Sequence, residues 1–141
     1  MADETASTPA VDATPPLGPP RGEPALRTVA MPADTNPSGD IFGGWLMARM
    51  DLAAGVAAAA RARGRVVTAA VSRMAFIQPV KVGDLVSCYT TVLRTGRTSV
   101  TLAVEVWAGR RGQDDVIKVT EAEFVLVAVD ASGKPRPVPP E

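Results

Sequence analysis

The chain has 141 residues, a formal net charge of zero and no histidine. Without an imidazole, the Ser-His-Asp and Cys-His arrangements of nucleophilic catalysis are excluded, as are metal and haem sites that need a histidine ligand. The single cysteine, Cys88, excludes an intrachain disulfide and a cysteine-ligated zinc site. If the protein is an enzyme, its proton-transfer groups at neutral pH are carboxylates, a perturbed lysine, the single tyrosine, or backbone and hydroxyl groups that act on water.

Charge and hydropathy also restrict the partners. A neutral chain lacks the basic excess that nucleic-acid binding normally needs, so no nucleic-acid partner is expected. No run of about 18 apolar residues occurs, so we expect no transmembrane helix and no membrane partner. The first 20 residues are acidic and proline-rich, unlike a signal peptide. A reducing, cytoplasmic location is the expectation.

The prolines divide the chain into three parts. Residues 1–24 hold six of the thirteen prolines and only two large aliphatic side chains, which predicts a disordered tail. Residues 131–141 hold four more prolines and are expected to leave the core as an extended strap or a flexible tail, with 138–141 outside the domain. Residues 25–137 are then one compact domain.

Within this domain the hydrophobic periodicity changes once, from helix to strand. Residues 27–31 predict a short strand, and residues 41–62 predict a long helix that is apolar nearly all round and therefore surrounded by protein. Four more strands are predicted, as an antiparallel meander, over 66–77, 84–93, 98–107 and 116–129. This pattern predicts an α+β fold in which a curved five-stranded antiparallel sheet wraps one long central helix, the hotdog architecture.

Asp51 is a carboxylate inside an otherwise apolar stretch of the predicted helix. Such a group is rarely buried unless it is paired or used. One interpretation is a structural ion pair with Arg49 or with a neighbouring chain. The other is a general base or nucleophile.

The predicted helix starts with two glycines, Gly43 and Gly44. Because they lack Cβ atoms, a ligand could approach the unsatisfied N–H groups of the first turn and form an oxyanion hole there. The alternative is that the glycines only permit a tight turn, with Asp40 as the helix cap.

The spacing of Gly44 and Asp51 bears on oligomeric state. They are seven residues apart, so they share a helix face but lie roughly 10 Å apart along the axis. A base and an oxyanion donor must each lie about 3 Å from one reacting centre. Two helices packed antiparallel across a two-fold axis satisfy this condition, which predicts an obligate homodimer with two composite sites. The face expected to allow the close approach carries Ala53, Ala54, Ala57 and Ala58.

Five motifs together carry a resemblance to a known family. They are residues 31–45, which end in Gly-Asp-Ile-Phe-Gly-Gly-Trp, the pair at 50–51, and the segments 64–68, 79–84 and 104–107. From about Arg27 to Pro137 the chain resembles the hotdog acyl-CoA thioesterases of the bacterial YciA type. The resemblance implies hydrolysis of acyl-CoA thioesters to free acid and CoA with broad acyl tolerance. It also implies a hexamer built as a trimer of dimers, and no cofactor beyond the CoA of the substrate.

The resemblance also assigns roles by position. It implies that Asp51 is the catalytic helix carboxylate, acting as general base or nucleophile, and that Gly44 donates the N–H that polarises the thioester carbonyl. Asn36 and Asp40 fall in the loop that shapes the site. Thr68 is a candidate hydroxyl contact, although threonine is also a good strand former.

CoA carries phosphates, so basic groups are expected at the entrance of the site. The best candidates lie in one predicted hairpin turn, which combines guanidinium, backbone and hydroxyl donors. They are Arg94, Gly96, Arg97, Thr98 and Ser99, with Gly43 at the helix start as a further CoA contact. Arg73 and Lys118, on strands, are further candidates, and a solvated surface position explains each of them equally well.

Two other functions compete with hydrolysis. A non-catalytic acyl-CoA sensor or structural hotdog module would bind the thioester without turnover and would not need Asp51. Dehydratase or hydratase chemistry on the same fold is disfavoured because its familiar forms use a histidine. Acyl-chain preference depends on how flexible and aromatic side chains pack around the site. These are Trp45, Met47, Met50, Met74 and Phe76.

Overall fold

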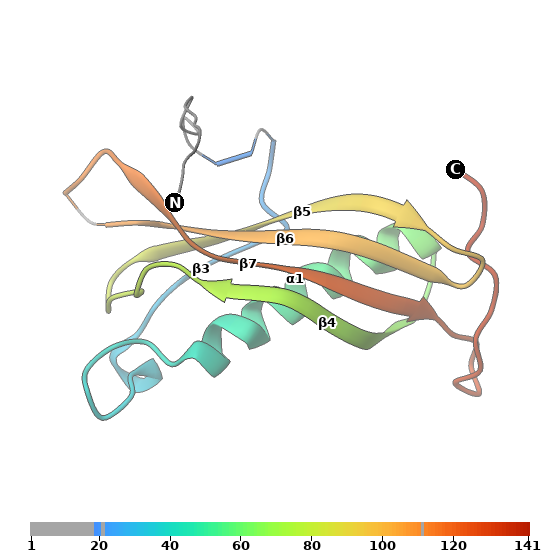
Figure 1. The fold of residues 1–141 in the computed structure, drawn as a ribbon, viewed down its shortest axis with the longest axis horizontal. Coiled ribbons are helices and arrows are strands. Elements are labelled where there is room, and N and C mark those ends of the chain that lie inside the picture. The colour runs from blue at the N-terminus through green and yellow to red at the C-terminus, as the bar shows by residue number, and fades with distance from the viewer. Residues whose placement is uncertain (1–18, 21, 111) are drawn as a thin grey trace, which may run out of the picture.

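A computed structural model describes residues 19, 20, 22–110 and 112–141. Its elements, in order, are β3 (Leu26–Val29), the 3-10 helix η1 (Pro32–Asp34), α1 (Gly43–Ala62), β4 (Val66–Phe76), β5 (Leu85–Thr95), β6 (Ser99–Gly109) and β7 (Val116–Ala128). The five strands form one antiparallel sheet, and α1 runs along one of its faces (Figure 1). The predicted fold class is confirmed. Most of the expected N-terminal tail lies outside the described residues.

The strand order, β3-β5-β6-β7-β4, corrects the predicted meander. Only β5, β6 and β7 follow one another as neighbours, whereas β4 pairs with β7 and forms the far edge of the sheet. The segment 77–84 crosses the end of the sheet to reach β5. Its first residue, Ile77, donates its N–H to the Val119 carbonyl at 2.8 Å, and Gly83 donates to the Ala30 carbonyl at 2.8 Å. These bonds hold the crossing segment against both halves of the sheet.

The core lies between α1 and the inner face of the sheet. The predicted alternation along β6 is confirmed, because its inward residues Val100, Leu102, Val104 and Val106 are all fully buried. The alanine row of α1 was expected to meet a second helix, and this expectation is wrong. Ala53, Ala54 and Ala58 are fully buried in the chain's own core, because small side chains let the helix approach its own sheet closely.

The opposite side of α1 is open in the single chain. Met47, Leu52 and Val56 are 43%, 53% and 58% exposed, so the single chain covers only one side of the helix, and its enclosure by protein stays a prediction about the assembly. A helix that is apolar all round but half uncovered presents a surface for another subunit.

The segment after β7 returns along the end of the sheet. The N–H of Val138 donates to the Arg97 carbonyl at 2.8 Å, and the Arg61 guanidinium donates to the Pro139 carbonyl at 2.6 Å. Val138 also packs against the core. These contacts join the β5–β6 turn to the C-terminal end of α1.

Candidate active site

The candidate site lies on the flank where α1 and β4 run side by side in opposite directions. At one end, a Cβ atom built on Gly43 would lie 3.4 Å from the Phe76 ring. At the other end, Asp51 is hydrogen-bonded to Thr68. Since β4 pairs on one side only, this flank stays open in the single chain.

Asp51 and Thr68, which the sequence places on different elements, meet in the structure. The Thr68 hydroxyl donates to Asp51 Oδ1 at 2.5 Å. Both residues border a hollow of about 300 Å³, which is otherwise apolar; its lining is Met47, Ala48, Asp51, Thr68, Val71, Met74 and Phe124. A carboxylate held by a hydroxyl beside an apolar hollow can take a proton from water or attack a bound acyl carbon.

Two expectations for Asp51 fail within the single chain. The side chain is exposed rather than buried in the single chain. The ion pair with Arg49 does not form among the described residues. The Arg49 guanidinium instead lies 5.1 Å from the centre of the Trp45 ring, in a cation–π contact. Arg49 and Asp51 are two residues apart, and each residue turns the helix by about 100°. The two side chains therefore project from different sides of the helix.

Replacing Thr68 tests whether its hydroxyl orients the carboxylate. Thr68→Val keeps the shape of the side chain and removes the 2.5 Å hydrogen bond to Asp51. We expect turnover of a thioester substrate to fall about 10-fold, because a misplaced base loses part of its effect. Steady-state kinetics with a thermal melt check this prediction. An unchanged kcat in a folded variant would show that the bond has no catalytic role.

At the start of α1, the structure differs from the interpretation in which Asp40 caps the helix. Phe42 is the N-cap residue and no side chain caps the helix, so the expectation that Asp40 is the cap is wrong. Asp40 instead pairs with Lys81 on the crossing segment, at 2.5 Å between Oδ1 and Nζ. Gly44 is exposed, and a Cβ atom built on it meets no atom within 4 Å. Its backbone N–H is therefore accessible to a ligand.

Asn36 shapes the loop that precedes the helix. Its side-chain oxygen accepts hydrogen bonds from the N–H groups of Ser38 (2.9 Å) and Asp40 (3.1 Å). Its own N–H donates to the Asp40 carbonyl at 2.7 Å. Asn36 thus fixes the turn, and the Asp40–Lys81 pair ties this turn to segment 77–84. Lys81 could not be found from the sequence, since nothing in its local pattern predicts a partner 41 residues away.

Asp84 is a second residue whose role was not predicted from the sequence. It anchors the crossing segment 77–84 to Arg110. It is 2% exposed, accepts the Lys81 N–H at 2.9 Å and lies 3.4 Å from the Arg110 guanidinium. Arg110 also donates to the Pro79 carbonyl at 2.9 Å. The signal was the Gly-Asp pair at 83–84, which immediately precedes β5 and whose glycine has a left-handed φ.

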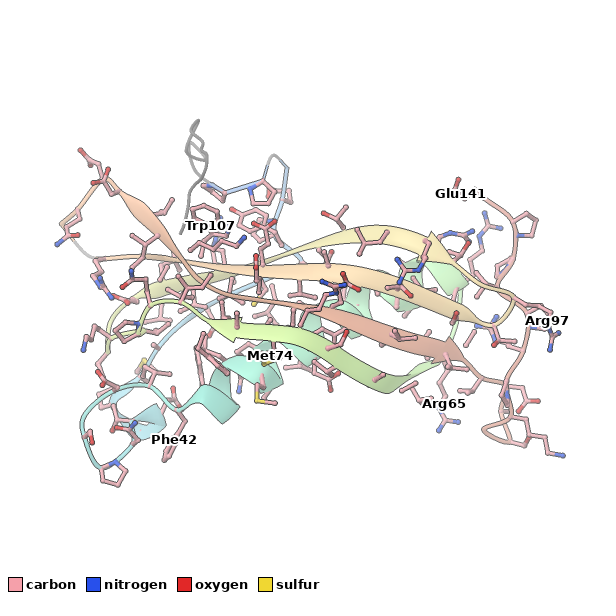
Figure 2. All side chains as sticks on the ribbon, in the orientation of Figure 1. Phe42, Arg65, Met74, Arg97, Trp107 and Glu141 are labelled. Atoms are coloured by element: carbon pink, nitrogen blue, oxygen red, sulfur yellow. The ribbon has the colours of Figure 1, made fainter. Side chains whose placement is uncertain are left out.

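The expected CoA-binding turn lies far from the helix start of the same chain. Residues 94–99 join β5 to β6 at the end of the molecule where α1 finishes, and Figure 2 shows Arg97 there, with Phe42 at the opposite end. The helix between these ends has 20 residues, a length of roughly 30 Å. One chain therefore does not bring the turn and Gly44 together.

Arg73 and Lys118 are occupied by carboxylates of their own chain. Arg73 lies 3.6 Å from Glu123, and Lys118 pairs with Glu105 and Glu121. Because alternate strand residues point to opposite faces, and Val104 and Val106 point toward α1, Glu105 belongs to the outer face of the sheet. Both cations thus sit away from the hollow beside Asp51.

Cys88 lies buried beneath α1 and takes no part in the site. Burial raises the pKa of its thiol to about 12, partly offset by the Arg49 charge. Because the reactive form is the thiolate, we expect an aromatic disulfide reagent at pH 8 to leave native protein unlabelled. One thiol per chain should react after denaturation. Rapid labelling of the native protein would contradict the packing around Cys88.

No group of three or more His, Cys, Asp or Glu side chains among the described residues is arranged to hold a metal ion. No helix there is long and apolar enough to cross a membrane.

Comparisons with known proteins show the family to which the chain belongs. A sequence model of the Thioesterase superfamily matches residues 38–114. The chain is 51% identical over 123 residues to the acyl-CoA thioester hydrolase YciA of Salmonella typhimurium, covering 85% of this chain and 92% of that protein. The structure is similar to that of the hexameric thioesterase y2039 of Yersinia pestis (TM-score 0.81, 51% identity, 86% of this chain and 99% of that one).

A third relative is more distant in sequence. Cj0915, a hexameric hotdog-fold thioesterase of Campylobacter jejuni, superposes with a TM-score of 0.80 at 44% identity, covering 84% of this chain and 91% of that one. The family match spans the helix start, Asp51, Thr68 and the β5–β6 turn. The protein is therefore a member of the thioesterase superfamily, a hotdog-fold enzyme of the YciA acyl-CoA thioester hydrolase type.

Proposed function

We propose that this protein hydrolyses acyl-CoA thioesters to carboxylic acids and CoA. The observation that carries the proposal is the Asp51–Thr68 pair beside an apolar hollow. This pair lies on the same flank of the molecule as Gly44, whose backbone N–H is accessible to a ligand. The names of the relatives, acyl-CoA thioester hydrolases, support this substrate class.

A dimer across the free edge of β4 would complete the site. Along the flank, Gly43 lies beside Phe76, and Asp51 lies beside Thr68. The midpoint between Gly44 and Asp51 on α1 therefore corresponds to residues 71–72 on β4. If two β4 strands pair antiparallel about this point, each Asp51 comes beside the partner's Gly44.

The exposed edge of β4 supports this mode of assembly. Val67, Val71 and Phe76 are between 40% and 53% exposed in the single chain. A long apolar edge strand tends to pair with another strand, and the contact would remove these side chains from water. Since the solved relatives are hexamers, we propose a trimer of such dimers.

The reaction then uses groups from both subunits. The N–H of Gly44 donates to the thioester carbonyl oxygen and stabilises the negative charge that develops on it. The partner's Asp51 takes a proton from water while the water oxygen attacks the carbonyl carbon. As the tetrahedral intermediate collapses, the C–S bond breaks and the CoA sulfur takes that proton. In the nucleophilic alternative, Asp51 attacks the carbonyl carbon first and water cleaves the resulting anhydride. Both routes need only water and this chain's own groups, so we propose no resident cofactor.

The same dimer gives the β5–β6 turn a role. In the antiparallel arrangement, the C-terminal half of one helix extends past the start of the other. The β5–β6 turn of the chain that supplies Asp51 would then lie where the CoA part of the bound substrate extends out of the site. Its candidate contacts are Arg94, Gly96, Arg97, Thr98 and Ser99. We propose that they contact its phosphates, whereas Arg73 and Lys118, held by carboxylates, contribute less.

Charge removal tests this role for the turn. We expect Arg94→Gln with Arg97→Gln to raise KM for acyl-CoA about 10-fold with kcat nearly unchanged, because phosphate contacts bind the ground state and the transition state alike. Arg65→Gln, at the same end of the molecule, is a matched control. An unchanged KM in the double variant would remove the turn from the CoA site.

Thiol release from acyl-CoA tests the proposed function itself. We expect purified protein to release CoA thiol from acyl-CoA esters across a series of chain lengths. Because we expect Cys88 to be silent toward thiol reagents at pH 8, the assay reads the product alone. Tight binding of acyl-CoA without thiol release would instead indicate a sensor.

We propose that the protein works in the cytoplasm, because its single cysteine is a buried free thiol, which a reducing compartment preserves. We place the catalytic domain at residues 25–137, and the segment that follows docks on it through Val138 and Pro139.

A further inference from the structure

β4 contains a bulge next to the hollow that Asp51 borders. Its regular pairing with β7 is interrupted between Ser72 and Ala75. In this interval Arg73 and Met74 together stand opposite one residue, Ala122. Arg73 has a φ of 55°, the left-handed region that side-chain-bearing residues rarely adopt. A strained bulge of this kind needs a reason in the structure around it.

The bulge decides which side chain enters the hollow. Ser72 faces outward, so strict alternation would turn Arg73 inward and Met74 outward. The extra residue reverses this order. The Arg73 side chain is 79% exposed and lies 3.6 Å from Glu123. Met74 instead packs against the core and lines the hollow with Asp51. Figure 2 shows Met74 where β4 passes over α1.

The lining of this hollow suits an alkyl chain. Apart from Asp51 and Thr68, its residues are apolar, and the almost fully buried Phe124 forms its floor. A thioester whose carbonyl carbon lies beside Asp51 can direct its acyl chain along β4 toward Met74.

A second hollow, of about 310 Å³, lies at the helix start and has a different character. It is lined by Ile41, Gly43, Leu46, Phe76, Ile77, Gln78, Pro79 and Val80. The amide of Gln78 and the backbone of the crossing segment offer polar contacts there. These suit the amide groups of the pantetheine arm of CoA better than an alkyl chain.

We infer that Met74, placed in the hollow by the bulge at Arg73, sets the length of the acyl chain that the enzyme accepts. The inference rests on the proposed function. Met74 is the specificity-determining residue, and Arg73 is a positioning residue that acts through it.

Substitutions at Met74 test the inference directly. Met74→Ala removes about three heavy atoms from the wall, so the preferred acyl chain should lengthen by about three carbons. The ratio of kcat/KM for a long over a short acyl-CoA should rise about 10-fold or more. Met74→Trp should change the ratio by a similar factor in the opposite direction. Leu85→Ala, on the far side of the sheet, is a control that should leave the ratio unchanged.

Substitutions at Arg73 test the role of the bulge. Glycine accepts a φ of 55° readily, so Arg73→Gly should keep Met74 in place and leave the chain-length preference unchanged. Arg73→Val disfavours the left-handed conformation, and we expect it to shift the preference in the same direction as Met74→Ala. A role in stability alone would lower the melting temperature without moving this ratio.

Binding of saturated carboxylic acids separates this inference from the proposed function, because it needs no turnover. Calorimetry should show the longest tightly bound acid lengthening in Met74→Ala and shortening in Met74→Trp. If the parent releases no thiol but this series shifts, the proposed function fails and the inference on the hollow stands. If neither the acids nor the kinetic ratio respond to Met74, or if both respond to Phe76→Ala instead, the inference is overturned.

Discussion

Asp51→Asn is expected to lower the turnover of acyl-CoA by about 10²-fold or more, the scale of losing an acid–base catalyst. Asparagine has nearly the same shape and can still accept the hydrogen bond from Thr68. It can neither take a proton from water nor attack an acyl carbon. We therefore expect the fold and the affinity for CoA to stay largely intact, with the loss confined to kcat.

Asp40→Asn is the matched control for this variant. Asp40 is a carboxylate of the same site region, but it pairs with Lys81 and does not contact Asp51 among the described bonds. We expect a much smaller loss of turnover from it. Thiol-release kinetics on both variants, with CoA binding by calorimetry, check the prediction. Unchanged turnover in Asp51→Asn would end the assignment of Asp51 as base or nucleophile.

Val67→Asp is expected to weaken the dimer by about 10²-fold or more and to remove activity with it. Val67 is 40% exposed on the free edge of β4. In the proposed dimer it would be covered, and an uncompensated carboxylate is costly to cover. Since Val67 does not line the hollow beside Asp51, the loss of activity would report assembly rather than substrate contact.

The control for Val67→Asp is Val116→Asp, at the start of β7 and also 40% exposed. Sedimentation velocity and thiol release should be measured on both variants over a range of protein concentrations. Activity of the first variant should return as concentration drives assembly, while the control should stay assembled and active. A monomer with full activity would contradict a shared site.

The fold was largely predictable because its elements carry clear local patterns. The alternation along residues 98–107 and the apolar stretch at 41–62 each match one element to within a few residues. Strand partners were not predictable in this way. Periodicity shows which face a residue occupies but not which strand lies beside it, and so the pairing of β4 with β7 was missed.

In the site, too, local motifs identified candidate residues, whereas the contacts between distant segments could not be predicted. The sequence marked Asp51 and Thr68 as candidates because of their residue types and the motifs around them, and the structure brings them into contact. Their catalytic roles remain a prediction. The alanine row was misassigned because a helix pattern alone cannot distinguish a sheet from a second helix as the packing surface. The bulge at Arg73 depends on register with β7, which no local pattern specifies.

Complementation between two inactive variants tests the composite site most directly. Asp51→Asn removes the carboxylate, and Gly44→Pro removes the N–H in the first turn of α1, where proline is best tolerated. Each variant alone should lose at least about 10²-fold in turnover. When the two are co-refolded, about half of the dimers are mixed, and each mixed dimer has one intact site. We expect recovery of about a quarter of the parent activity, and no recovery in a mixture that forms mixed dimers would contradict the composite site.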